Sequence, residues 1–377
     1  AFMRPFLEGG VGNPSASHSL GAEARESLEA ARTKVSRLFG GSPSGLIFTS
    51  GATEANNLAV RGVALRAAEK GRHIVTSAIE HISVLNACRN LEKRGFSVTY
   101  LPVDSEGRVD VQALSMAIRP ETALVSIMAA NGEIGTVQPA GEIGRIVRER
   151  GVPFHVDAVG AAGRIPLSVD DLGIDLLTLS SNDLYGPPGA GALWVRPGVK
   201  ILPQILGAGQ ERGYRSGTEN LPAIVGMGVA ADLARAEWRE ETARLAAIRG
   251  RLVEDIHARV SEFRLTGSRT SRLPHHASMC IRSVKAESVL MELDLEGITA
   301  STGSACSSRT REPSHVLTAI GCDPEETEGS LCFTLGRWTT AAEVERAAQA
   351  LARVVGRLRA LSPRVSGPAF GGHPPIR

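Results

Sequence analysis

Short apolar runs alternate with amphipathic segments along the first half of the chain. The apolar runs predict strands over 46–48, 73–77, 97–103, 123–128, 153–156 and 174–179. Apolar residues at helical spacing predict helices between them, over 23–39, through Asn56 and Val60, and over 83–93, 110–118 and 140–150. Repeated strand–helix units of this length predict an α/β fold, in which a mainly parallel central sheet carries helices on both faces.

The pattern changes after a long helical stretch that runs from Glu219 to about Val260. Apolar runs at 277–281, 298–301 and 331–335 then alternate with helical segments at 286–295 and 341–361. We therefore expect a large α/β domain over residues 1–240 and a smaller α+β domain over residues 241–361. Residues 362–377 are rich in Pro and Gly and are predicted to form a tail without a packing pattern of its own.

Composition and net charge limit the kinds of partner that we expect this protein to bind. The 377 residues are 42% hydrophobic and 22% charged, which is typical of a globular protein of two or three domains. A net charge of +2 gives no reason to expect nucleic acid or an anionic membrane as a partner, and no apolar run is long enough to span a membrane. The five scattered cysteines form no C-x-x-C pair and no signal-peptide pattern is present, so we expect a cytoplasmic protein.

The stretch from Thr178 to Val195 joins two apolar runs through a tight connection. Its turn, Gly186-Pro-Pro-Gly189, combines residues that permit positive φ with residues that fix φ, so the chain reverses within a few positions. The polar residues before the turn, Ser180 to Asp183, therefore lie at the end of a strand. Ligands of parallel sheets bind at the carboxyl ends of the strands, which makes this loop the first candidate for a site.

Other polar motifs also fall at predicted strand ends. The turn Gly51-Ala52-Thr53 leads from a strand into a helix, and its free amides suit an anion, although such a turn standing alone is more often a simple helix cap. Asp157 ends a buried strand, where a carboxylate accepts from a buried donor or caps a turn. His81 follows another strand, and a lone histidine there more commonly serves neighbouring polar groups than catalysis.

The loop 178–195 resembles the cofactor-lysine loop of the cysteine desulfurases, class-V aminotransferases of the fold-type I pyridoxal phosphate (PLP) superfamily. In that family the loop reads Ser-x-His-Lys-x-x-Gly-Pro-x-Gly, and its lysine holds PLP. Here Asn182 stands at the histidine position and Asp183 at the lysine position. The stretch from Ala300 to Ser308 is similar to the catalytic-cysteine loop of the family, with Cys306 as its cysteine. The resemblance covers most of the chain and implies the fold-type I PLP-transferase architecture, in which the smaller domain carries the Cys306 loop.

The resemblance implies PLP as the cofactor and assigns roles to individual residues. Asp157 would keep the pyridine nitrogen protonated, which makes the ring an electron sink, and His81 would stack on the ring and move protons as a catalytic residue. Matches to the residues that surround PLP are Ala52, Thr53, Ser180, Asn182 and Thr218. In the family the residue at the position of Thr218 reaches in from a second subunit, so we expect a homodimer.

Cys306 is the candidate nucleophile. A single cysteine is commonly a small buried apolar group, but the loop around this one makes the match specific. In the family this cysteine attacks the sulfur of PLP-bound L-cysteine, leaving alanine and an enzyme persulfide. Cys306 is accordingly the candidate catalytic residue and persulfide carrier. Because thiolates suit iron and sulfide, it is also the candidate ligand of a 2Fe-2S cluster shared with an iron–sulfur scaffold protein.

Asp183 departs from the family at the reactive atom. A carboxylate cannot form an imine or move protons as an amine does, and none of the five lysines sits at a strand end with a turn behind it. Cys332 stands where the family usually keeps an arginine for the substrate carboxylate. The other departures are Gly132, Gly160 and Asn182. Since several positions have changed together, we take Asp183 as the native residue and expect PLP to bind non-covalently, weakly or not at all.

Three hypotheses follow. In the first, the protein is a cysteine desulfurase homologue that serves iron–sulfur cluster assembly while its own desulfuration is impaired, and Cys306 is loaded from free sulfide or ligates a cluster. In the second, it is a working PLP-dependent cysteine desulfurase with an unusual site. In the third, it is a binding or structural partner without a role in sulfur transfer.

Overall fold

A computed structural model describes residues 1–9, 12–303 and 313–361. The chain divides into two compact units. The first contains residues 1–103, 108–131 and 137–239, and the second contains residues 104–107, 132–136 and the chain from Glu240 onward. Cys306 and the tail at 362–377 lie outside the described residues. No helix in the described ranges is long and apolar enough to cross a membrane.

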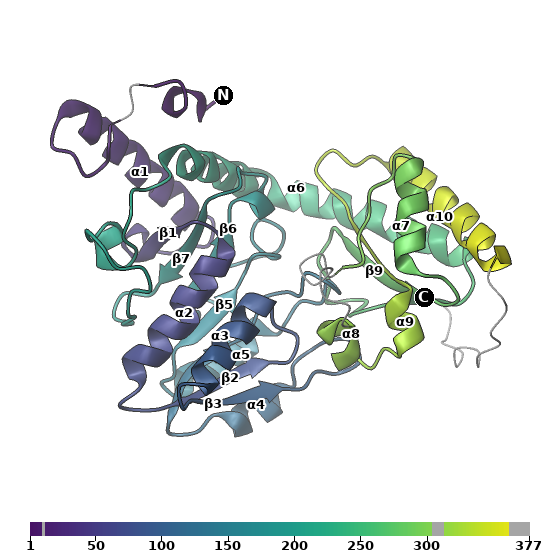
Figure 1. The fold of residues 1–377 in the computed structure, drawn as a ribbon, viewed down its shortest axis with the longest axis horizontal. Helices are drawn as coiled ribbons and strands as arrows, with labels where there is room; N and C mark the ends of the chain where they lie inside the picture. Colours follow the sequence, from purple (N-terminus) through teal and green to yellow (C-terminus); the bar gives the residue numbers. More distant parts are fainter. Residues whose placement is uncertain (10–11, 304–312, 362–377) are drawn as a thin grey trace. The chain divides into compact units, whose positions relative to one another are not determined.

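Strands and helices alternate through the first unit (Figure 1). Its strands are β1 (Leu46–Thr49), β2 (His73–Ser77), β3 (Ser97–Leu101), β4 (Thr122–Ser126), β5 (Phe154–Asp157), β6 (Leu176–Ser180) and β7 (Gly191–Val195). Its helices are α1 (Ser19–Arg37), α2 (Ala52–Ala67), α3 (Ile82–Glu92), α4 (Val111–Ala117), α5 (Ala140–Glu149) and the part of α6 (Leu221–Arg259) up to Arg239. Single 3-10 turns are η1 (Arg4–Phe6), η2 (Pro43–Gly45), η3 (Asn182–Leu184) and η4 (Glu211–Gly213).

Within the described chain, the strands of the first unit form one sheet in the order β1-β7-β6-β5-β4-β2-β3. The neighbours from β6 through β3 pair in parallel, whereas β7 runs antiparallel to both β6 and β1. The expectation of a mainly parallel sheet is therefore confirmed. Because the parallel strands all end at the same edge, the loops that follow β2, β5 and β6 converge there.

Helices cover both faces of this sheet, as expected. Leu124 and Leu193 point to the face on which the apolar sides of α2 and α3 pack. Trp194, the next residue along β7, points to the opposite face, since side chains alternate along a strand. There its ring meets that of Phe39, just past the end of α1, with the ring centroids 6.0 Å apart. The sheet is thus buried on both sides, which explains why its strands read as nearly continuous apolar runs.

A buried ion pair fixes the segment at η4 against β1. The two terminal nitrogens of Arg32, in α1, each donate a 2.7 Å hydrogen bond to the carboxylate of Glu211. The same carboxylate accepts the backbone amide of Phe48 in β1 at 2.8 Å. Both charged side chains are almost fully buried, at 3% and 1% exposure, so each needs the other as its counter-charge.

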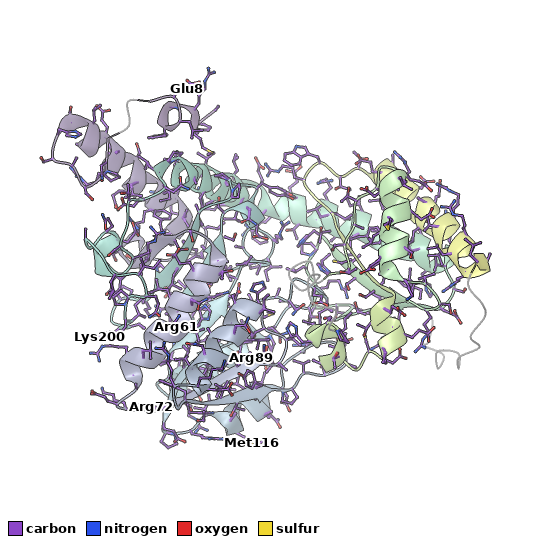
Figure 2. All side chains as sticks on the ribbon, in the orientation of Figure 1. Glu8, Arg61, Arg72, Arg89, Met116 and Lys200 are labelled. Atoms are coloured by element: carbon purple, nitrogen blue, oxygen red, sulfur yellow. The ribbon has the colours of Figure 1, made fainter. Side chains whose placement is uncertain are left out.

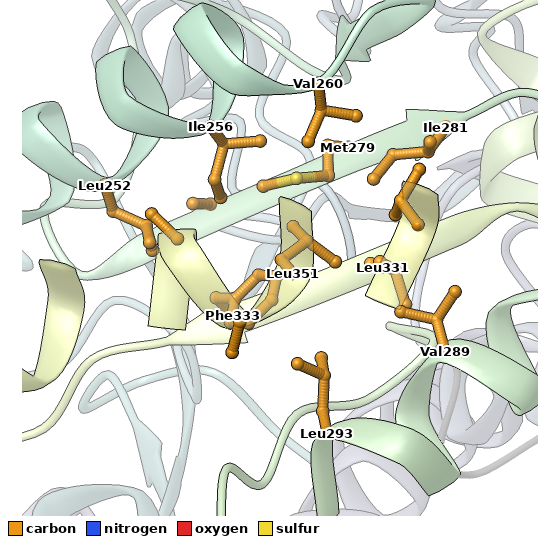
Figure 3. Packing of buried hydrophobic residues seen from close by; sticks show 14 of the residues in the cluster. Leu252, Ile256, Val260, Met279, Ile281, Val289, Leu293, Leu331, Phe333 and Leu351 are labelled. Atoms are coloured by element: carbon orange, nitrogen blue, oxygen red, sulfur yellow. The ribbon is translucent and has the colours of Figure 1, made fainter. Parts of the chain in front are cut away.

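The second unit combines a small antiparallel sheet with helices. Its strands are β8 (Phe263–Leu265), β9 (His276–Ile281) and β10 (Ser330–Thr334), in the order β10-β9-β8. Its helices are the later part of α6, then α7 (Ala286–Leu295), α8 (His315–Ala319), α9 (Pro324–Glu328) and α10 (Ala341–Leu361). One face of β9, with Met279 and Ile281, packs into an apolar core formed with α6, α7 and α10 (Figure 3). The other face carries His276, Ser278 and Cys280.

One predicted strand is wrong and one strand was not predicted. Residues 298–301 do not form a strand: after α7 ends, only Ser301 of this run pairs with another segment, through two backbone hydrogen bonds with Cys332. The apolar run is short, and its first amide is used to close the end of α7, where Ile298 bonds to the carbonyl of Leu293. The strand actually present on the far side of β9 is β8, three half-buried residues without a strong apolar pattern.

Candidate functional site

The start of α2 lies at the carboxyl edge of the large sheet. Gly51 precedes the helix, and none of the described side chains caps it, so the first helical amides remain available to solvent or to a ligand. In β7, Gly191 lies so close that an added Cβ would be 2.6 Å from the Cα atom of Gly51. Ser180, at the end of β6, pairs across with Gly191. The structure therefore brings Ala52, Thr53 and Ser180 to one place, where helix-start amides and a hydroxyl suit an anion such as a phosphate.

Asp157 is the end of a hydrogen-bonded chain that reaches His81. The side-chain nitrogen of Asn56, in α2, donates to Oδ2 of Asp157 at 2.7 Å and to the hydroxyl of Ser83 at 2.9 Å. That hydroxyl in turn lies 2.7 Å from Nδ1 of His81. The second oxygen of Asp157 accepts the amide of Val159 at 3.0 Å. Asp157 is 6% exposed and Asn56 is fully buried, so this chain of bonds holds a carboxylate and an imidazole at the same edge of the sheet.

His81 has a defined orientation. It is the N-cap residue of α3, and its Nδ1 accepts the backbone amide of Ser83 at 3.2 Å. Since Nδ1 is an acceptor, the neutral ring carries its proton on Nε2, the nitrogen on the other side of the ring. The preceding residue, Glu80, is fully buried and accepts from the hydroxyl of Ser77 at 2.6 Å and the amide of Met128 at 3.0 Å. Burial raises the pKa of Glu80 to about 8.

Asp183 lies in η3, directly after β6. Its carboxylate accepts from the side-chain nitrogen of Asn182 at 2.9 Å, and Asn182 itself accepts from the hydroxyl of Ser180 at 2.6 Å. Burial raises the pKa of Asp183, the guanidinium of Arg164 opposes this, and the negative charge of Asp157 adds to it. Two carboxyl groups at one site therefore repel each other, where the family places a lysine against the cofactor.

None of the five lysines stands in the loop after β6. Lys34 pairs with Asp232 at 3.6 Å, and Lys285 pairs with Glu328 at 3.0 Å. Lys70 and Lys200 line a hollow of about 510 Å³ with Thr122 and other residues. Thr122 begins β4, so this hollow is at the opposite edge of the sheet from Asp183; Lys200 lies at the periphery of the unit in Figure 2. The fifth lysine, Lys93, follows the end of α3, whereas the site lies at the start of that helix.

Two further residues, Thr218 and Cys332, have surroundings of their own. Thr218 is exposed in a segment of the first unit that follows η4. Cys332 belongs to the second unit, where its sulfur lies 3.2 Å from Nε2 of His276 and burial raises its pKa to about 12. A neutral, buried thiol offers no charge to a substrate carboxylate. Among the described residues no cluster of histidine, cysteine and acidic side chains could hold a metal ion; Cys306 is outside this range.

Asn56 and Ser83 are the site residues that sequence reasoning missed. Asn56 was expected only as part of a helix, and Ser83 only as a helix start. A signal was present, because asparagine is unfavourable inside a helix unless its amide has a partner, and the adjacent Asn57 shows the ordinary alternative by bonding back to the carbonyl of Thr53 at 2.9 Å. Whether Asn56 or Asn57 is buried depends on which side of α2 faces the sheet, and the sequence does not show this.

The fold and site place the chain in a known family. The model for the family described as aminotransferase class-V matches residues 1–347, so the chain belongs to that family. Within it, the chain is similar to proteins named cysteine desulfurase: it is 49% identical over 361 residues to cysteine desulfurase IscS 1 of Archaeoglobus fulgidus, covering 96% of this chain and 94% of the relative. It is 47% identical to cysteine desulfurase IscS of Dictyoglomus turgidum, covering 96% and 92%.

Solved structures agree with the sequence relatives. A structure described as a NifS-like protein is 35% identical, with a TM-score of 0.88 and 94% of each chain covered. A second, described as SspA in complex with cysteine, is 36% identical, with a TM-score of 0.78, covering 90% of this chain and 94% of that one. The resemblance to the cysteine desulfurases and the fold-type I architecture are thereby confirmed.

The described residues fit PLP in part. The uncapped start of α2, with Gly191 leaving room beside Gly51, fits the phosphate. The buried carboxylate of Asp157, held by Asn56, fits the pyridine nitrogen. Asp183 does not fit the covalent attachment that the family uses, since its carboxylate cannot form that bond. The described residues thus fit the phosphate and the pyridine nitrogen of PLP, and Asp183 does not fit its covalent attachment.

Proposed function

We propose that this protein is a cysteine desulfurase homologue that carries sulfur for iron–sulfur cluster assembly, with the release of sulfur from L-cysteine impaired. The observation that carries the proposal is Asp183, a carboxyl group near Asp157 at the position of the family's lysine, with none of the five lysines in the loop after β6. We place the protein in the cytoplasm as a homodimer, in which Thr218 of each subunit serves the site of the other, with an iron–sulfur scaffold protein as partner.

Different residues of the site would bind different parts of PLP. PLP, when bound, supplies a ring that withdraws electrons from the α-carbon of an amino acid. The start of α2 and Ser180 would hold its phosphate, and Asp157 would hold the proton at the pyridine nitrogen. His81 presents the Nε2 side of its ring, because Nδ1 is occupied by Ser83. In the family an amine at this position moves the proton at the α-carbon. Asp183 offers a carboxyl group instead, and we therefore expect the release of sulfur from L-cysteine to be slow.

Cys306 would act as the sulfur carrier. A thiolate reaches the persulfide level by attacking sulfane sulfur, for example the terminal atom of a polysulfide, whereupon the shortened polysulfide leaves with the bonding electron pair. Free sulfide gives the same product only when an electron acceptor removes two electrons. The alternative role for Cys306 is ligation of a 2Fe-2S cluster shared with the scaffold protein, which thiolates favour.

The test measures two products separately. The purified protein is incubated with PLP and L-cysteine, and alanine and sulfide are quantified; it is then incubated with polysulfide, and the mass of the peptide containing Cys306 is measured. We expect alanine at a small fraction of ordinary enzymatic rates, and one added sulfur atom on that peptide, absent in Cys306→Ser. Alanine production at ordinary rates would overturn the impairment, and an unchanged peptide mass would overturn the carrier role.

A second candidate function is supported by the intact chain from Asp157 through Asn56 and Ser83 to His81. That chain suits a working PLP-dependent cysteine desulfurase in which another amine takes part. Borohydride treatment of the PLP-loaded protein distinguishes the two functions. PLP fixed to an identified lysine, together with alanine production, supports the working enzyme, whereas release of all PLP on denaturation supports the impaired one.

A further inference from the structure

The turn before α2 is fixed from three sides. One carboxylate oxygen of Glu54, in the first turn of the helix, accepts the backbone amide of Ser50 at 2.8 Å and its hydroxyl at 2.5 Å. The hydroxyl of Thr49 donates to the carbonyl of Gly51 at 3.0 Å. On the remaining side, a Cβ added to Gly191 would lie 2.6 Å from the Cα atom of Gly51. The residues that lead into the helix-start amides are therefore held in place.

Glu54 also brings a negative charge close to those amides. Burial alone would raise the pKa of Glu54, but hydrogen bonds from Arg215 and Ser50 outweigh burial and lower it, so the side chain is a carboxylate at neutral pH. A helical turn rises about 5.4 Å, which is shorter than the roughly 8 Å over which physiological salt screens charges. Without a counter-charge, this carboxylate would therefore repel a phosphate bound to the amides of the same turn.

Arg215 supplies the counter-charge. Its Nε donates to the second oxygen of Glu54 at 2.9 Å, and the two side chains are 21% and 16% exposed. A Cβ added to Gly217 would lie 3.6 Å from Nη1 of Arg215, so the guanidinium lies beside the backbone of its own loop. That loop is closed by the amide of Gly217, which donates to the side-chain oxygen of Gln210 at 2.9 Å. The ion pair therefore joins a closed loop to the start of α2.

We propose that Glu54 and Arg215 are positioning residues for the phosphate of PLP. Glu54 fixes the turn that presents the helix-start amides, and Arg215 cancels the charge of Glu54, so that the turn accepts an anion. Both residues act through these amides and not on the reacting atoms. The inference rests on the PLP site of the proposed function, but it does not depend on whether the protein releases sulfur from L-cysteine.

The ordinary alternative is that Glu54 only caps α2 and that Arg215 only anchors its loop. The second unit contains a matched pair for comparison. Arg337 and Glu241 are joined by a 3.1 Å hydrogen bond, and their side chains are 24% and 18% exposed. The two pairs are nearly equal in length and burial. Arg337→Gln therefore reports what the loss of a half-buried ion pair does without the removal of a charge beside the phosphate site.

The experiment titrates the full-length protein with pyridoxine phosphate, which carries the ring and phosphate of PLP without the aldehyde, so lysines cannot form imines with it. Arg215→Gln leaves the carboxylate of Glu54 uncompensated and should weaken binding at least about tenfold. The double variant Arg215→Gln with Glu54→Gln removes both charges and should recover most of this loss, because the amide oxygen at position 54 can still accept from Ser50. Arg215→Lys keeps the charge and should retain most of the affinity.

Urea unfolding of each variant establishes that it is folded, and Arg337→Gln should leave the affinity unchanged. A double variant that binds no better than Arg215→Gln would show that the pair is only structural and would overturn the inference. So would a loss in Arg337→Gln as large as that in Arg215→Gln, or an unaltered protein that does not bind pyridoxine phosphate. Failure of the proposed function appears separately, as alanine production at ordinary rates, so the two failures are distinguishable.

Discussion

Asn56, in the second turn of α2, donates a 2.7 Å hydrogen bond to Oδ2 of Asp157 at the end of β5, 101 residues away. This bond joins the helix whose first turn suits a phosphate to the carboxylate that suits a pyridine nitrogen. The two parts of the proposed PLP site are therefore joined by a direct hydrogen bond of the protein.

The first prediction concerns Asp157→Asn. The substitution keeps the size of the side chain and removes its negative charge, and a hydrogen bond to a charged group contributes about 1.5–3 kcal/mol. PLP affinity, measured by titrating the protein and following its fluorescence, should therefore fall by roughly ten- to a hundredfold. Asp175→Asn is the matched control, because Asp175 lies at the other end of β6 and pairs with Arg196. Equal affinity in both variants would contradict the assignment of Asp157.

The second prediction concerns Asp183→Lys. An amine at this position gains the ability to bond covalently to PLP, so borohydride treatment should add the mass of the reduced cofactor to one peptide, the one containing position 183. Asp183→Asn, which matches the size of the native side chain, should show no such addition. If PLP stays fully removable from the D183K variant, the site does not orient the cofactor as the family does.

The third prediction uses the pH dependence of unfolding. The carboxyl of Glu80 titrates near pH 4.5 in the unfolded chain and, because it is buried, near 8 in the folded chain. Between these values the folded state holds one proton more, so the stability from this group is complete below 4.5 and is lost as the pH rises through 8, at up to about 1.4 kcal/mol per pH unit. Glu80→Gln should flatten the urea-unfolding free energy between pH 5 and pH 8.

The control for this pH experiment is Glu69→Gln, an exposed carboxyl just beyond α2. It should leave the slope as in the wild type. In Glu80→Gln the amide oxygen can still accept from Ser77 and Met128, so the variant should also be more stable than the wild type at pH 8. A slope that is the same in both variants would show that Glu80 is ionised in the folded protein at neutral pH.

The fourth prediction concerns the ion pair of Arg32 and Glu211. Glu211→Gln leaves a buried guanidinium without its counter-charge, and breaking such a pair costs about 3–5 kcal/mol. The midpoint of urea unfolding should fall accordingly. Glu8→Gln breaks a pair with Arg4 in which both side chains are mostly exposed, and should change stability by less than about 1 kcal/mol. Similar losses in the two variants would mean that the Arg32 pair is solvated in solution.

Most helices and strands could be predicted because the apolar pattern that indicates each one lies within its own residues. The helix expected from Glu219 to Val260 is observed as Leu221–Arg259, and the strand expected over 73–77 is observed as His73–Ser77. The strand expected over 298–301 fails because forming a strand requires a partner along its length, and only Ser301 has one. β8 was not predicted for the converse reason, since its three residues become a strand only by pairing with β9.

The site was predictable where it coincides with a motif and not where it depends on packing. The turn Gly51-Ala52-Thr53 and the loop at Asp183 stand out in the sequence, and the structure places both at the carboxyl edge of the sheet. The bond from Asn56 to Ser83 joins two helices, α2 and α3, and no spacing in the sequence indicates it.

The turn that contains Asp183 closes through backbone groups alone: Leu184 and Gly186 bond to the carbonyl of Ser181, and Tyr185 bonds to that of Asn182. The backbone bonds of the turn therefore do not involve the side chain at position 183, whose carboxylate only accepts from Asn182. A different residue at position 183, such as the lysine of Asp183→Lys, can therefore be accommodated while the backbone of the turn stays as it is.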